Sequence, residues 1–301
     1  MVKIADAVSR ALAVRDETGG SGYPQARVLA HGEGWTAADV VCASRPHDRP
    51  FEEQHERVSI TIVAAGTFQY RSALGQELMT PGSLMLGSPG QRFECGHEHG
   101  AGDRCISFWY EPDDFERLAA EAGVAASYLE FPVLRLPPLR ELSPIVARAC
   151  AGITGLADVS WDELAAMLAV RTLRLVAGPA SRAGDTPPRA VARVSQVVRA
   201  MERHELGAGL ELRHLARTAG LSPFHFLRTF KRVTGLTPHQ YLLRARLREA
   251  GRRLTTESGR ILDIALDCGF GDVSNFNHTF RSEFGISPRQ FRSARQLTSG
   301  E

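Results

Sequence analysis

Two stretches near the C-terminal end of the chain repeat the same alternation of apolar and polar positions. They are "AGLSPFHFLRTFKRVTGLTPHQY" (219–241) and "CGFGDVSNFNHTFRSEFGISPRQF" (268–291). In each copy, apolar residues one helical turn apart predict the buried stripe of an amphipathic helix. The stripe is Phe226, Phe230 and Val233 in the first copy, and Phe276, Phe280 and Phe284 in the second. The exposed positions differ, so the pattern predicts two copies of one scaffold with different outward surfaces.

Start and stop signals divide each copy into a helix, a tight turn and a second helix. Gly220 and Gly269 can end the first helix, and Ser222 or Asp272 can cap the second. Two helices joined by a short turn form a helix-turn-helix unit, whose second helix can enter the major groove of DNA. A capping box begins a long helix over residues 237–254, which is predicted to hold the two units apart.

The outward side chains of the two second helices are the candidates for contact with DNA. They are Phe224, Leu227, Arg228 and Lys231 in the first copy, and Ser274, Asn275, His278 and Arg281 in the second. Residues 187–301 carry 19 Lys and Arg against 10 Asp and Glu, a net charge of +9, while residues 1–186 carry a net charge of −7. A helical bundle with a solvated basic surface would have a similar charge. Two capped copies and a spacer favour double-stranded DNA as the partner.

A stretch rich in Gly, Pro and Ala, "GPASRAGDTPPRA" (178–190), has no apolar periodicity and coincides with the change of charge sign. We therefore predict a linker at 179–190 between an N-terminal domain (1–178) and an all-α C-terminal domain (191–301). No run approaches the roughly 18 apolar residues of a membrane span, so no membrane partner is predicted. Five cysteines without a framework spacing favour a reduced, cytoplasmic setting.

Residues 190–295 resemble the DNA-binding domain of the AraC/XylS family of bacterial transcription regulators. The signature stretch is "ILDIALDCGFGDVSNFNHTFRSEFGISPRQFR" (261–292). The resemblance implies a seven-helix domain whose two recognition helices enter successive major grooves on one face of the DNA. It places base-contacting positions at Phe224, Leu227 and Arg228 and at Ser274, Asn275 and His278. It also implies a cupin-like sensing barrel in the N-terminal domain and neighbouring helices that form a dimer interface.

Strand-like segments at short spacing predict a small barrel or sandwich in the N-terminal domain. "SITIVAAGTFQY" (59–70) is β-branched and aromatic, and Gly66 at its centre suggests a hairpin. Short strand-like stretches separated by turns also occur in "PGSLMLGSPGQRFECG" (81–96) and "RCISFWYEP" (104–112). Beyond Pro112, apolar faces at helical spacing predict helices that pack on the barrel. The predicted fold class is α+β: a cupin-like β-barrel with flanking helices, then an all-α domain with two helix-turn-helix units.

The segment "CGHEHGAGDRC" (95–105) gathers Cys95, His97, His99 and Cys105, and we predict that they line an effector pocket. In a strand, Cys95, His97 and His99 would share one face, and a turn at Gly102 would place Cys105 opposite His99. A metal ion bound by His97, His99 and Cys105 is the alternative. Cys95 and His99 would lie about 13 Å apart in a regular strand, too far to share one ion. The prediction is a metal-free pocket without a cofactor.

These features together predict a cytoplasmic regulator that binds specific DNA, responds to a small effector and forms a homodimer. As an activator it would also contact RNA polymerase. One alternative is a cupin-type metal enzyme fused to a DNA-binding module, but no acid/base pair is evident, and we predict that the chain is not an enzyme. A second is a DNA alkyl-repair regulator with a zinc-bound cysteine, which needs four clustered cysteines. Only Cys95 and Cys105 lie close together in the sequence.

Overall fold

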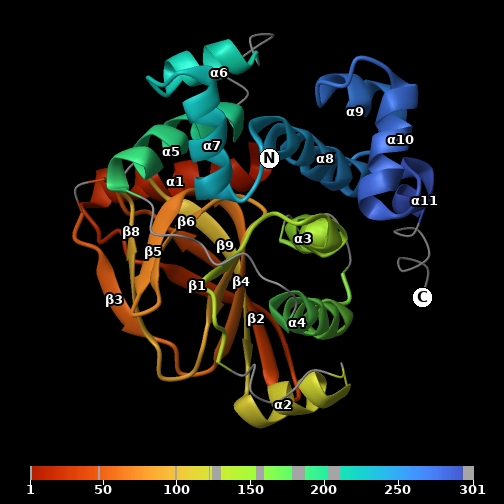
Figure 1. Cartoon of the computed structure of the whole chain (residues 1–301). Helices are drawn as coiled ribbons and strands as arrows, with labels where there is room; N and C mark the ends of the chain where they lie inside the picture. Colours follow the sequence, from red (N-terminus) through yellow and green to blue (C-terminus); the bar gives the residue numbers. More distant parts are fainter. Residues whose placement is uncertain are drawn as a thin grey trace.

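The computed structural model describes residues 2–46, 48–98, 100–121, 123, 130–153, 159–177, 187–202 and 211–293. Figure 1 shows the N-terminal strands as one body, with helices on one side and the C-terminal helices packed against one end. Most of the predicted linker lies outside the described residues: helix α4 ends at Ala177, and α5 begins at Pro188.

Ten strands in the described part of the chain form two antiparallel sheets. The six-stranded sheet has the order β1 (Gln25–Gly32), β2 (Trp35–Cys42), β9 (Asp103–Tyr110), β4 (Val58–Gly66), β7 (Leu84–Gly87), β10 (Arg135–Leu136). The four-stranded sheet has the order β3 (Phe51–Gln54), β8 (Arg92–Gly96), β5 (Phe68–Ser72), β6 (Gly75–Met79). Phe51, Tyr70 and Phe93 of the smaller sheet share one buried cluster with Val63 and Cys105 of the larger. The sheets therefore face each other around a common interior, as the barrel prediction requires.

The alternation of side chains along β4 gives the larger sheet two different faces. Ile60 and Ile62 point outward into the core beneath the helices, whereas Ser59 and Thr61 point into the interior. This follows from the two-residue period of a strand. β9 alternates in the same way, with Ile106, Phe108 and Tyr110 outward and Asp103, Cys105 and Ser107 inward. The alternation of side chains along these two strands therefore places polar groups inside the barrel.

The hairpin predicted at Gly66 is wrong. Strand β4 pairs with β7 and β9, while β5 pairs with β6 and β8, so the chain passes from one sheet to the other near this glycine. Gly66 has a positive φ of 82°. A Cβ there would lie 2.4 Å from the carbonyl oxygen of Gly102, so a larger residue would also clash with the neighbouring strand.

Helices cover the outer face of the larger sheet, as predicted for the region beyond Pro112. They are α1 (Val2–Thr18), α2 (Pro112–Glu121), α3 (Ser143–Gly152) and α4 (Trp161–Ala177), with a short 3-10 helix η2 (Arg140–Leu142). Ile4 of α1, Phe115 of α2 and Leu168 of α4 join the same core as Ile60 and Phe108. Within the described residues, no helix is long and apolar enough to span a membrane.

The described C-terminal residues form seven helices, in agreement with the resemblance. They are α5 (Pro188–Glu202), α6 (Leu212–Thr218), α7 (Pro223–Thr234), α8 (Pro238–Thr256), α9 (Ile261–Asp267), α10 (Val273–Phe284) and α11 (Pro288–Ser293). They build two cores rather than one: Phe226 and Phe230 pack with α5, and Phe276 and Phe280 pack with α9 and α11. Helix α8 contributes Tyr241 to the first core and Leu247 to the second, and so joins them.

Candidate nucleic-acid interface and effector cavity

The first helix-turn-helix unit has the local hydrogen bonds that its sequence predicts. The Leu221 amide donates to the carbonyl oxygen of Ala216 at 2.9 Å, which closes the end of α6 around Gly220. Ser222 caps α7 by accepting a bond from the amide of His225 at 3.4 Å. Gly235 then ends α7 in the left-handed conformation, with φ 80°.

The second unit repeats this geometry with different residues. The Phe270 amide donates to the carbonyl oxygen of Ala265 at 3.1 Å, and Asp272 accepts a bond from the amide of Asn275 at 2.7 Å. Gly285 ends α10 with φ 79°. The exposed side chain of an N-cap residue and a glycine after the helix fix where each second helix begins and ends.

The predicted DNA-contacting side chains lie on the outer surface of α7 and α10. Phe226, Phe230, Phe276 and Phe280 are fully buried, which leaves the opposite faces of both helices free. Seven of the eight candidates are exposed and one, Leu227, is half-buried: Phe224, Leu227, Arg228, Lys231, Ser274, Asn275, His278 and Arg281. Phe224 is 77% exposed, which is unusual for so large an apolar side chain.

Helix α8 sets the distance between the two units. Its capping box is present: Thr237 accepts from the Gln240 amide at 3.2 Å, and the Gln240 side chain accepts from the Thr237 amide at 3.1 Å. Its 19 residues correspond to a length of about 28 Å. Figure 1 places α7 and α10 on either side of α8. This length is close to the ~34 Å of one turn of DNA.

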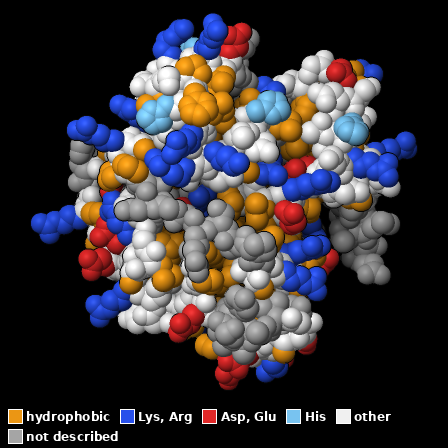
Figure 2. All heavy atoms as spheres, viewed as in Figure 1, with side chains coloured by type: hydrophobic (Ala, Val, Ile, Leu, Met, Phe, Trp, Pro, Cys, Tyr) orange, Lys and Arg blue, Asp and Glu red, His pale blue; other side chains and the backbone are white. Residues whose placement is uncertain are grey.

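Not all of the positive charge in the C-terminal part is available to a polyanion. Arginines of α8 form ion pairs, including Arg248 with Glu202 at 2.9 Å and Arg252 with Glu249 at 2.7 Å. Figure 2 shows Lys and Arg side chains across the upper part of the molecule, where the C-terminal helices lie. The exposed basic residues on the helix-turn-helix helices are Arg213, Arg217, Arg228, Lys231, Arg232 and Arg281.

The interior of the barrel contains a cavity of about 860 Å³. Its walls combine aromatic rings with hydroxyl groups: Phe51, Phe68, Phe93 and Trp109, and Ser59, Thr61 and Ser107. The Thr61 hydroxyl donates to Ser107 Oγ across β4 and β9 at 3.0 Å. A concave, mainly apolar space with a few polar groups is the usual form of a small-molecule site, and this volume lies within the common range.

A buried histidine, His55, forms part of the cavity wall. Its ring stacks on Phe93 with centroids 4.1 Å apart, and its Nε2 is hydrogen-bonded to the hydroxyl of Tyr70 at 2.8 Å. The Tyr70 hydroxyl in turn donates to the carbonyl oxygen of Leu86 at 3.0 Å. Burial lowers the pKa of His55 to about 4, so this ring is neutral at neutral pH.

The segment 95–105 lies at the cavity, although not in the predicted geometry. Cys95 and Cys105 both line it, but from facing sheets rather than from one hairpin. Strand β8 ends at Gly96, so His97 follows the strand instead of sharing a strand face with Cys95. His97 is buried, and its Nε2 is 2.6 Å from Asp103 Oδ1. His99 lies outside the described residues.

The cavity thiols are buried and protonated. Burial raises the pKa of Cys42 to about 12, and the nearby Asp103 carboxylate adds to this effect. Burial likewise raises the pKa of Cys95 and Cys105 well above the ordinary value. Because the thiolate is the reactive form, these pKa values disfavour a thiol-reactive sensor.

Sequence reasoning did not identify Cys42 or Asp103 as site residues. Cys42 and Asp103 are cross-strand partners at the ends of β2 and β9. The alternation of Asp103, Cys105 and Ser107 along β9 is a sequence signal that could have placed Asp103 in the cavity wall. No such signal exists for Cys42, because its position beside Asp103 depends on the pairing of β2 with β9.

The family model and the sequence relatives of this chain are helix-turn-helix proteins. The family described as "Helix-turn-helix domain" matches residues 215–294. The HTH-type transcriptional activator RhaS of Salmonella agona (strain SL483) is 30% identical over 195 residues, which are 62% of this chain and 68% of that protein. An AraC-type transcriptional regulator of known structure from Chromobacterium violaceum is 33% identical over 34% of this chain and 91% of its own, with a TM-score of 0.32. ToxT from Vibrio cholerae O395 is 13% identical over 88% of this chain and 99% of its own, with a TM-score of 0.34.

Two helix-turn-helix units on one spacer helix, joined to a strand-rich N-terminal domain, define a DNA-binding transcription regulator. The chain belongs to the AraC-type family of helix-turn-helix transcription regulators.

Proposed function

We propose that this regulator reads a specific DNA site through α7 and α10 together, and that a small molecule in the barrel cavity controls it. The proposed domains are residues 1–178 for sensing and dimerisation and residues 191–301 for DNA binding, joined by 179–190. The observation that carries the proposal is that two recognition helices on one spacer helix expose different sets of side chains.

The side chains of the two helices suit different modes of reading. Arg228 can form a bidentate bond with guanine, and Asn275 can do so with adenine. Phe224 and Leu227 can contact thymine methyl groups. Lys231 and Arg281 lie farther along their helices and are suited to phosphate. Ser274 and His278 complete the polar surface of α10, which makes it the more polar of the two helices.

The cavity is suited to a small molecule with an apolar body and several polar groups. Phe51, Phe68 and Phe93 would pack against the apolar part, and the hydroxyls of Thr61 and Ser107 would bind the polar groups. Cys95 and Cys105 line the same space, and His97 lies beside it. The described cavity lining contains three carboxylates, from Glu53, Glu56 and Asp103, and one guanidinium, from Arg57. This excess of negative charge favours a neutral or positively charged effector over an anion.

The remaining partners follow from this scheme. A homodimer formed through residues 1–178 would present two pairs of recognition helices, and the affinity of such a dimer for DNA would exceed that of one chain. RhaS is named a transcriptional activator, and an activator at a bacterial promoter would contact RNA polymerase. We propose a cytoplasmic regulator of this kind rather than an enzyme.

Selection of DNA sites by the full-length chain tests the DNA-binding proposal. Selected sites should bind at least about a thousandfold more tightly than random DNA. Affinity should fall steeply with salt, because each phosphate contact releases counterions. Equal affinity for selected and random DNA would exclude sequence-specific reading. A fragment of residues 187–301 that binds as tightly as the full chain would argue against dimerisation through the N-terminal domain.

A thermal-shift screen of the full-length chain against small metabolites tests the effector site. A compound that stabilises the wild type should stabilise a Thr61→Val, Ser107→Ala double variant much less. Ser160→Ala, which alters a hydroxyl outside the cavity lining, is the matched control. A compound that shifts all three proteins equally binds elsewhere.

A further inference from the structure

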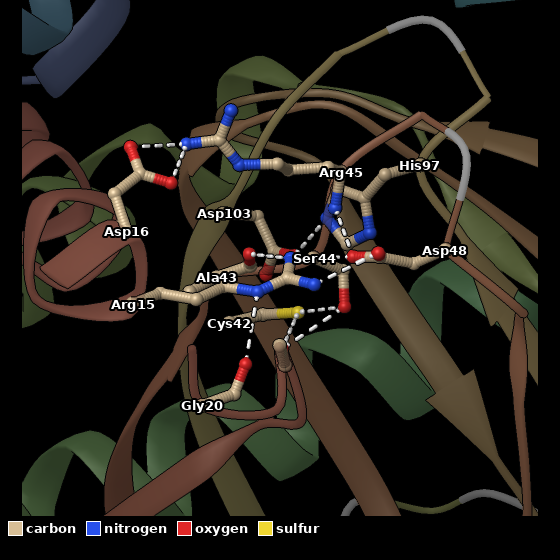
Figure 3. Close-up of polar contacts among 11 residues, drawn as sticks. Arg15, Asp16, Gly20, Cys42, Ala43, Ser44, Arg45, Asp48, His97 and Asp103 are labelled. Atoms are coloured by element: carbon tan, nitrogen blue, oxygen red, sulfur yellow. Dashed lines mark hydrogen bonds and ion pairs between the residues drawn. The ribbon is translucent and has the colours of Figure 1, made fainter. Parts of the chain in front are cut away.

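Three buried side chains from separate parts of the fold meet at one end of the barrel. Cys42 ends β2, Asp103 begins β9, and His97 follows β8. Each offers one ligand atom, and these atoms all lie within 4.8 Å of one another. Figure 3 shows the three side chains converging beside Ser44 and the Arg15–Asp48 pair. We propose that Cys42, His97 and Asp103 bind a divalent metal ion of the zinc class.

The charge around Asp103 is the first argument. Its side chain is only 8% exposed, and its hydrogen-bond partners include His97 Nε2 at 2.6 Å and Cys105 Sγ at 3.2 Å. Within the described part of the chain, no Arg or Lys forms an ion pair with it; Arg15 instead binds Asp48, with Nη1 and Oδ2 2.5 Å apart. A buried carboxylate is costly unless a positive charge compensates it. A cation between these ligands would supply that charge.

The histidine provides the second argument. The His97 side chain is 1% exposed, and its Nδ1 has no hydrogen-bond partner in the structure. A buried ring nitrogen normally has a partner, so an unpaired one indicates a missing ligand. Imidazole is a common ligand of zinc and related ions.

The ligand set and its spacing select the class of ion. Bond lengths of about 2.0 Å to nitrogen and oxygen and 2.3 Å to sulfur place tetrahedral ligand atoms roughly 3.3–3.6 Å apart. The observed cluster could reach this spacing with small side-chain movements. A thiol with an imidazole and a carboxylate suits zinc, cobalt or nickel, whereas magnesium and calcium prefer oxygen ligands alone. Binding would release the proton of the Cys42 thiol, because the thiolate is the form that binds a metal ion.

This assignment differs from the one that the sequence suggested. Cys42 and Asp103 replace Cys105 and His99 as ligands, and only His97 is common to both sets. Cys42, Asp103 and Cys105 also line the cavity, so the fourth coordination position of the ion would face that space. Zinc sites with three protein ligands often keep such an open position. The proposal concerns metal binding itself and does not depend on the identity of the effector.

Titration of the chelator-treated, full-length chain with Co²⁺ tests the proposal. The wild type should bind one ion per chain, and a thiolate-to-cobalt charge-transfer band should appear in the near-ultraviolet spectrum. Cys42→Ser should lose the band and, like His97→Gln and Asp103→Asn, weaken binding at least about 100-fold. Cys105→Ser should retain both band and stoichiometry. Cys150→Ser alters a buried cysteine in α3 and is the matched control.

Three results of the Co²⁺ titration would overturn the proposed metal site. Absence of stoichiometric Co²⁺ binding by the wild type would overturn the proposal, as would unchanged binding by Cys42→Ser. Loss of the band in Cys105→Ser but not in Cys42→Ser would also overturn this ligand set. Circular dichroism and DNA binding of each variant report whether it is folded. If Cys42→Ser does not fold, Co²⁺ binding by His97→Gln and Asp103→Asn tests the ligand set instead. Asp103→Asn keeps a hydrogen-bond acceptor for His97, and unchanged binding by both variants would overturn the proposal.

Discussion

Arg135 donates a hydrogen bond from Nη1 to the carbonyl oxygen of Thr234 at 3.0 Å, and this contact joins the N-terminal barrel to the end of the first recognition helix. Its Nη2 donates to the carbonyl oxygen of Val233, and its Nε to Glu77 Oε2. The last carbonyl groups of a helix have no partner within the helix, so Arg135 satisfies them and its charge matches the helix dipole. The barrel therefore holds α7 at the end where the helix meets α8.

The second recognition helix is also held from the N-terminal domain. The hydroxyl of Ser143, at the start of α3, donates to Glu283 of α10 at 2.6 Å. Arg244 of α8 binds the same carboxylate and also donates to the carbonyl oxygen of Pro138. Both recognition helices thus end against elements of the N-terminal domain. Under the proposed control by a small molecule, these contacts would transmit occupancy of the cavity to the positions of the two helices.

We predict that Arg135→Ala loosens the docking of the barrel on α7. The change leaves the Glu77 carboxylate, which is 13% exposed, and two helix-end carbonyl groups without their partner, at a cost of up to about 3 kcal/mol in the free energy of unfolding. Hydrogen exchange should become faster at the end of α7 and remain unchanged in α10. The control is Arg57→Ala, which removes an arginine paired with Glu111 near the surface. The same exchange rates in both variants would show that Arg135 does not hold the helix.

We predict that Arg228→Ala removes sequence preference at one position of the binding site. Arg228 is exposed on α7, where a bidentate contact with guanine is worth about 1–3 kcal/mol. Binding to the selected site should fall by that amount, with a much smaller loss on random DNA. Arg117→Ala removes the same charge from α2, at the opposite end of the molecule in Figure 1, and should change neither affinity. Equal losses on both DNAs would reduce Arg228 to a phosphate contact.

We predict that one chain protects two major grooves about one helical turn apart on a single face of the DNA. The reason is the length of α8 and the separate core that each helix-turn-helix unit builds at either end of it. Hydroxyl-radical footprinting of the full chain should show this spacing. Inserting about five base pairs between the two contacted segments rotates them onto opposite faces and should abolish simultaneous contact. A footprint of one groove, unchanged by the insertion, would contradict docking through both helices.

We predict that acid weakens the N-terminal domain through His55. Burial lowers the pKa of this ring from 6.5 to about 4, so the unfolded chain binds more protons between these values. The contribution to stability is complete above pH 6.5 and is lost as the pH falls through about 4, by up to about 3 kcal/mol. In urea unfolding across this range, His55→Gln should show a flatter pH dependence than the wild type. An unchanged slope would mean that other groups dominate acid unfolding.

The pair of helix-turn-helix units was predictable from the sequence because its signals are local. The stripe of Phe276, Phe280 and Phe284, the cap at Asp272 and the stop at Gly285 act within a few residues of one another. These short-range preferences agree with the tertiary fold. The sequence therefore predicted the helices, their buried faces and their exposed side chains. The alternation along β9 was readable for the same reason.

The cavity and the proposed metal site were decided by tertiary structure. The expected hairpin at Gly66 failed because strand partners are chosen by long-range packing: β4 and β5 enter different sheets. Cys42 and Asp103 are far apart in the sequence, and only the β2–β9 register makes them neighbours. His97 joins them because β8 ends at Gly96 in the facing sheet. Side chains converge in a barrel through the pairing of distant strands, and no local pattern in the sequence specifies that pairing.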